Sequence, residues 1–157
     1  MRRRCLLSSS ALVLTALAFV AAGSASIVPQ RSIAGIKLGL SERGVRAKLG
    51  APIKVRTGTN IAGHWRRLIY PRVTIAFQNG GKATFIFTKS RLEKTASGVG
   101  VGSRLVQVRA GLRGETCKRE FGAYHCWTGR WEPGQVVTDF VFGHSRVAQI
   151  ALGYVID

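Results

Sequence analysis

The chain has 157 residues, of which 46% are hydrophobic, and its formal net charge is +17. The hydrophobic content excludes an intrinsically disordered protein, and the length suits one compact domain or two small units that share a core. The excess of Lys and Arg predicts attraction to polyanions and acidic surfaces, but without a nucleic-acid-reading motif it predicts no specific nucleic-acid binding.

Residues 1–25 have the pattern of a secretory signal peptide. Arg2–Arg4 carry positive charge, Ala11–Ala22 form an apolar stretch that is short for a membrane span, and Gly23-Ser24-Ala25 are the small residues typical of a cleavage site. Cys5 precedes the apolar stretch instead of standing at the cleavage point, which argues against a lipoprotein. We expect cleavage after Ala25 and a secreted, periplasmic or envelope location, with no transmembrane segment in the mature chain; a retained anchor is the alternative.

After a short lead at residues 26–34, residues 35–88 read as a first unit of one helix followed by strands. Ser41 is a good N-cap, and the expected helix runs from there to about Leu49, where Gly50 and Pro52 end it. Alternating apolar residues then predict strands at about Trp65–Tyr70, Val73–Gln78 and Ala83–Thr88, the last two joined by the turn signal Asn79-Gly80-Gly81.

Residues 89–97 read as a connector to a second unit at residues 98–157. Ser103 is the expected N-cap of a helix from about Arg104 to Leu112, and Gly114 follows its end. The strands predicted in this unit are Tyr124–Thr128, Val136–Phe142 and Arg146–Leu152, with Gly143-His144-Ser145 as the turn between the last two.

The two units begin with the same phrase. Gly35-Ile36-Lys37-Leu38-Gly39 and Gly98-Val99-Gly100-Val101-Gly102 have glycine at both ends and aliphatic residues between them, and each is followed by a Val and a Leu at matching positions. A phrase repeated at a fixed period indicates a duplicated supersecondary unit. We therefore predict an α+β fold in which two tandem helix-plus-antiparallel-sheet repeats form one curved, layered domain.

Two cysteines remain after the predicted cleavage, Cys117 and Cys126. An even pair in an exported chain indicates a disulfide, and Gly122 between them predicts a hairpin that the bond would staple. Zinc is the rival explanation because His125 and His144 are available. Their spacing matches no zinc template, so we expect no metal site.

The repeated phrase also carries a resemblance to a known group. Gly-aliphatic-x-Leu/Val-Gly, then Val, then Leu49-Gly50-Ala51-Pro52, then a Trp/Tyr-containing strand and a strand–Gly–strand hairpin resemble the superfamily of small exported helix-plus-sheet modules. That group includes the tandem-repeat β-lactamase inhibitor proteins and the small lipoprotein of the outer-membrane assembly machine. The resemblance implies two sheets joined into one curved surface, with helices behind it and a concave face that binds protein.

Two departures keep the inhibitors' target out of this inference. The inhibitors insert an acidic residue from a first-repeat hairpin into the enzyme, whereas the corresponding turn here, Gln78–Lys82, has no acid. The inhibitors also carry a disulfide in each repeat, and this chain can form one in the second unit alone. The resemblance therefore implies the fold and does not extend to a β-lactamase partner.

No catalytic motif is present. The sequence lacks a nucleophile elbow, a His-Glu-x-x-His zinc site and a phosphate-binding loop, and Ser103 occupies the third glycine position that a dinucleotide loop at Gly98 would need. The carboxylates of Glu115, Glu120, Glu132 and Asp139 are scattered among basic neighbours, where salt-bridge roles are expected. We expect neither an enzyme nor a cofactor, and keep a hydrolase of unfamiliar type as the least favoured reading.

Two binding functions then compete. The favoured one is protein–protein binding in the envelope or extracellular space through a sheet face, and the alternative is charge-driven binding to anionic polymers or lipid surfaces. The Trp residues could instead be buried core, a choice that the pattern leaves open. The candidate binding residues are Trp65, Arg66, Arg67 and Trp127 on the strands, and Arg109, Arg113 and Lys118 around the second helix.

Overall fold

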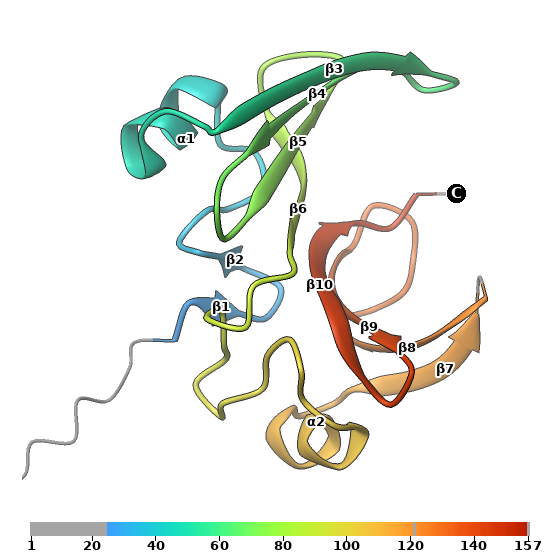
Figure 1. Cartoon of the computed structure of the whole chain (residues 1–157). Helices are drawn as coiled ribbons and strands as arrows, with labels where there is room; N and C mark the ends of the chain where they lie inside the picture. The colour runs from blue at the N-terminus through green and yellow to red at the C-terminus, as the bar shows by residue number, and fades with distance from the viewer. Residues whose placement is uncertain (1–24, 121, 157) are drawn as a thin grey trace, which may run out of the picture.

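The computed structural model describes residues 25–120 and 122–156. Strands are the main secondary structure of this part of the chain, with two short helices (Figure 1). In chain order the elements are β1 (Ile27–Val28), β2 (Ser32–Ile33), α1 (Glu42–Leu49), β3 (Lys54–Asn60), β4 (Gly63–Ile69), β5 (Thr74–Gln78), β6 (Ala83–Thr88), α2 (Leu105–Gly111), β7 (Thr116–Glu120), β8 (Ala123–Thr128), β9 (Val136–Gly143) and β10 (Arg146–Tyr154).

The main sheet has 8 antiparallel strands in the order β3-β4-β5-β6-β10-β9-β8-β7. Strands β3 to β6 pair in sequence order, and so do strands β7 to β10. The two groups meet where β6 pairs with β10 (Figure 1). The register at this junction places Phe85 opposite Gly153 and Ile86 opposite Leu152. A separate two-stranded sheet joins β1 to β2.

The predicted α+β fold of two helix-plus-sheet repeats is wrong. The chain instead forms a mostly β structure with one continuous sheet, and its helices have only 8 and 7 residues. The repeated glycine phrases mark similar turns, since Gly39 and Gly102 both have positive φ, at 78° and 93°. The prediction also missed β3, because most of this edge strand is exposed and shows no apolar alternation.

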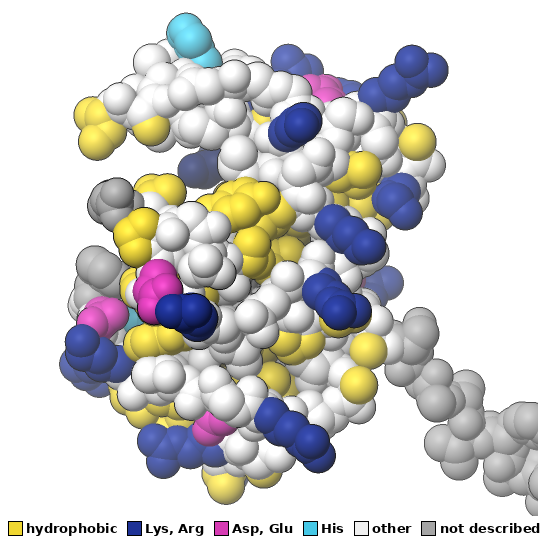
Figure 2. Space-filling model, turned by 180° about the vertical axis from the view of Figure 1, so that it is seen from behind, with side chains coloured by type: hydrophobic (Ala, Val, Ile, Leu, Met, Phe, Trp, Pro, Cys, Tyr) yellow, Lys and Arg dark blue, Asp and Glu magenta, His cyan; other side chains and the backbone are white. Residues whose placement is uncertain are grey.

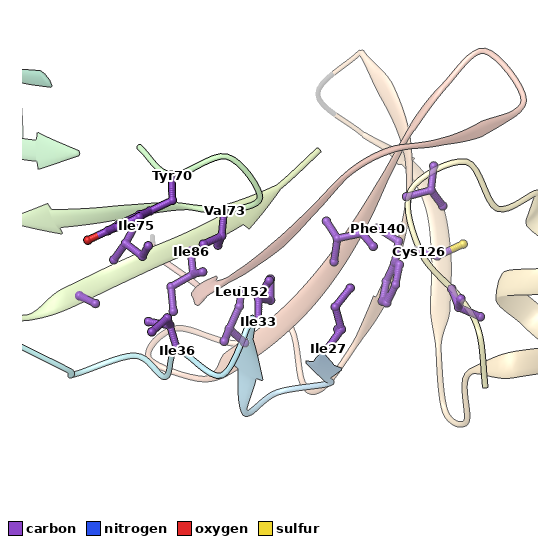
Figure 3. Packing of buried hydrophobic residues seen from close by; sticks show 14 of the residues in the cluster. Ile27, Ile33, Ile36, Tyr70, Val73, Ile75, Ile86, Cys126, Phe140 and Leu152 are labelled. Atoms are coloured by element: carbon purple, nitrogen blue, oxygen red, sulfur yellow. The ribbon is translucent and has the colours of Figure 1, made fainter. Parts of the chain in front are cut away.

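One face of the sheet forms the hydrophobic core. A row of directly paired side chains crosses the sheet from β4 to β9, formed by Leu68, Ile75, Ile86, Leu152 and Thr138. All five residues are fully buried. The N-terminal lead, the two glycine phrases and the helical segments cover this face, as Figure 3 shows for Ile27, Ile33 and Ile36; the covering residues are Ile27, Ile33, Ile36, Val45, Val99, Val108 and Leu112.

Helix caps agree with the sequence in the first helix and differ in the second. The Ser41 hydroxyl accepts a hydrogen bond from the Gly44 amide at 3.1 Å, as an N-cap should. The N-cap of α2 is Arg104 instead of Ser103, and its backbone amide donates to the Gln107 side chain at 2.8 Å. Ser103 Oγ instead accepts from the Gly100 amide at 3.0 Å, so it stabilises the turn before the helix.

The predicted disulfide is confirmed. Cys117 and Cys126 are bonded and lie directly opposite each other on β7 and β8, which form the expected hairpin. Because β7 is the outermost strand at this end of the sheet, the bond fixes an edge that has one neighbouring strand. Within the described ranges no helix is both long and apolar enough to cross a membrane.

Leu152→Ala should lower the free energy of unfolding by about 3 kcal/mol, because Leu152 is fully buried and the cavity would open at the junction of the two halves. Urea denaturation checks this value. Val106→Ala is the control, since Val106 on α2 is 69% exposed and its truncation should change stability by less than about 0.5 kcal/mol. Equal losses in both variants would contradict the placement of the core.

Candidate functional site

The second face of the sheet lies opposite the helices and carries the side chains that alternate with the core row. Strand register places Arg67, Ala76, Phe85, Gly153 and Val137 in one row across this face. Both helices contribute buried residues, Val45 and Val108, to the core cluster on the other face. We refer to the face that carries the row from Arg67 to Val137 as the open face.

A cleft of about 320 Å³ lies on the open face where the two halves of the sheet join. Val137, Ala151 and Gly153 form part of its floor, and Phe85 and Trp131 contribute aromatic rings to its lining. Figure 2 shows hydrophobic side chains gathered around a hollow between the two halves of the molecule. No Lys or Arg lines the cleft, although the chain has 24 of them.

Glycine at two positions lets an aromatic ring approach the opposite strand closely. Gly153 faces Phe85 across the β6–β10 junction, and a Cβ on Gly153 would come within 2.7 Å of the Phe85 ring. The same arrangement occurs on β3 and β4, where a Cβ on Gly58 would come within 2.5 Å of the Trp65 ring. Both rings are therefore held against bare backbone, which fixes their orientation on the open face.

A loop between β8 and β9 supplies another aromatic residue of the cleft. Trp131 is 40% exposed and packs against Trp127, which is only 7% exposed, with 4.8 Å between the ring centroids and the rings tilted by 55°. The loop is held to the C-terminal segment because the Val155 amide donates to Gln135 O and the Gly134 amide donates to Val155 O, each at 2.9 Å. The exposed aromatic surface here belongs to Trp131, and the buried Trp127 ring packs beneath it.

One acidic residue reaches this apolar region. Asp139 lines the cleft, and its Oδ2 lies 2.8 Å from His125 Nδ1 on the neighbouring strand. Its other oxygen is buried and has no hydrogen-bond partner among the residues that the structure describes. Burial therefore raises the pKa of the Asp139 carboxyl above the ordinary 3.8, and the interaction with His125 opposes that rise only in part.

The predicted strand residues are only partly brought together. Trp65 and Arg67 lie on the open face of β4, with the Arg67 guanidinium 4.8 Å from the Trp65 ring centroid. Arg66 points to the other side and makes an ion pair with Glu42 at 3.0 Å. Trp127 lies in the other half of the sheet and is buried, so it offers little surface to a partner.

The predicted basic residues lie away from the cleft. Arg109 on α2 and Arg113 just after it are exposed, and Lys118 on β7 pairs with Glu120. Sequence reasoning missed Phe85, Trp131 and Tyr154 as site residues. The alternation in β6 assigns Phe85 to one face, but the pattern cannot say which face the helices cover.

Comparisons with known proteins give one distant likeness. No protein family and no curated protein matches the sequence. A solved structure, an extracellular protein containing a SCP domain from Bacillus anthracis str. Ames, is similar with a TM-score of 0.51 and 10% sequence identity, covering 74% of this chain and 44% of that one. The chain thus spans less than half of that structure, and at this identity the likeness concerns the fold alone. The resemblance to the β-lactamase inhibitor proteins stays a prediction.

Asp139→Asn tests the buried carboxyl. A raised pKa means that the folded protein binds this proton more tightly than the unfolded chain, so the wild-type protein gains stability from Asp139 as the pH falls through the raised pKa towards 3.8. The wild-type minus Asp139→Asn difference in unfolding free energy should therefore increase on acidification. Urea denaturation of both proteins across pH 7 to 3.5, roughly the range in which carboxyls titrate, measures it. A difference that decreases on acidification would instead show that the pairing with His125 dominates.

Proposed function

We propose that this chain is an exported, non-enzymatic binding module that holds a protein partner on the open face of its sheet. The observation that supports this best is the apolar cleft with exposed aromatic side chains at its rim. Phe85 is 39% exposed, Trp131 40% and Tyr154 45%, and all three line the cleft. Exposed aromatic groups around a hollow are typical of protein-binding sites, where Trp and Tyr contribute most of the affinity.

The extent of the open face favours a protein segment over a small ligand. Arg67 and Phe85 occupy the same row two strands apart, which is about 10 Å across the sheet. Trp65 and Arg67 therefore extend the aromatic surface from the cleft towards the β3–β4 edge. A partner that covers both places would cross the strands of the first half and reach the junction.

Three features support export. The first residues have the signal-peptide pattern, Cys117 and Cys126 form a disulfide, and the structural neighbour is described as an extracellular protein. Binding would then take place in the envelope or outside the cell. Cleavage after Ala25 remains part of this proposal.

The alternative function is attachment to an anionic envelope polymer or lipid surface by charge. It is supported by the exposure of Arg109, Arg113 and Lys118 on one end of the molecule. Salt separates the two functions, because charge-driven binding weakens steeply with ionic strength and an aromatic contact weakens little.

Trp131→Ala and Phe85→Ala should each weaken binding to the open face by about 2 kcal/mol, because each removes an exposed aromatic ring from the rim of the cleft. Peptides selected from a random display library on the immobilised wild-type protein serve as probes, and titration calorimetry measures their affinity for each variant at low and high salt.

The matched controls are Arg109→Gln and Val106→Ala, which change exposed positions on α2. Circular dichroism confirms that every variant is folded. Selected peptides that bind the cleft variants as tightly as the wild type would contradict the proposal. Binding that instead depends on Arg109 and disappears at high salt would favour the alternative function.

A further inference from the structure

A second cavity, of about 490 Å³, lies away from the cleft, where the connector, the second glycine phrase and the start of β10 meet. Arg91, Lys94 and Arg146 line it, and no acidic residue does. None of the three forms an ion pair with a described residue, whereas the chain pairs Arg46, Arg66, Arg72 and Arg130 with carboxylates elsewhere. We call this cavity the basic cavity.

The fold brings the three cations together from separate parts of the chain. Lys94 forms an isolated antiparallel bridge with Gly100, and the Arg146 guanidinium donates a hydrogen bond to the Gly102 carbonyl at 2.8 Å. Arg91 Nε lies 3.7 Å from the point where a Cβ on Gly102 would stand. Three like charges held around one glycine-rich turn repel each other, and an anion between them would relieve that repulsion.

The neutral groups of the basic cavity are also arranged as donors. Ser103 Oγ accepts a hydrogen bond from the Gly100 amide at 3.0 Å, which leaves its hydroxyl hydrogen to donate. Gln107 Oε1 accepts from the Arg104 amide at 2.8 Å, which leaves its NH₂ group to donate. Both side chains line the cavity beside the three cations. A ligand made only of acceptors fits this set.

We propose that the basic cavity is a binding site for a phosphate group, either free phosphate or the phosphate of a polar headgroup. Guanidinium and ammonium groups with additional neutral donors suit a tetrahedral oxyanion, which offers more acceptor positions than a carboxylate. This site is independent of the open face and shares no lining residue with the cleft. The basic residues that the sequence singled out, Arg109, Arg113 and Lys118, do not line it.

The test measures binding of inorganic phosphate and of glycerol 3-phosphate by titration calorimetry, at ionic strength held constant with sodium chloride. Arg91→Gln and Arg146→Gln should each lower the affinity for either probe about tenfold, as expected when one charge-assisted hydrogen bond is lost. Arg43→Gln on α1 and Arg56→Gln on β3 remove the same charge outside the cavity and should change the affinity less than about twofold, because exposed charges on other elements are screened.

Arg91→Gln keeps the test decisive if Arg146→Gln weakens the fold, since Arg146 bonds to Gly102 whereas Arg91 makes no hydrogen bond or ion pair with a described residue. Tighter binding of glycerol 3-phosphate than of phosphate would identify a headgroup as the source, and equal affinities would identify free phosphate. No binding of either probe, or equal losses in the Arg91 and Arg43 variants, would overturn the proposal.

Discussion

The pairing of β6 with β10 is the interaction on which the rest of this structure depends. It joins β3–β6 and β7–β10 into one sheet, and it completes the core row by placing Ile86 opposite Leu152. On the other face the same ladder places Phe85 beside Gly153 and so forms the middle of the cleft. The core and the candidate binding site are thus two sides of one strand junction, and a change in its register would exchange the residues that each face presents.

The strands and turns were largely predictable because their causes are local. Alternation placed Phe140 and Phe142 on one face, and they are 0% and 8% exposed as core residues. Ser41 was correctly predicted as an N-cap because its hydroxyl serves an amide three residues away. One local contact was misassigned, because Ser103 accepts from the Gly100 amide three residues earlier and Arg104 begins the helix. The other failures concern longer range.

The binding surfaces were harder to predict for the same reason. Strand alternation gives the face of Trp127 but cannot show that Trp131, from a loop, packs against it. The basic cavity requires Arg146 to reach Gly102, 44 residues earlier in the chain. Residue type drew attention to the clustered Arg109 and Arg113, whereas the structure collects the cations of the basic cavity from two segments, the connector and the start of β10.

Charge also protects the two outer strands of the sheet. An unpaired edge strand exposes backbone groups that can recruit a strand from another molecule. At one end, β3 bears the exposed Lys54 and Arg56, and at the other, β7 bears Lys118 and Arg119 beside its disulfide. Two copies that approached edge to edge would bring like charges together along these strands. Part of the net charge of +17 therefore acts between molecules, where it opposes sheet extension and aggregation at high local concentration.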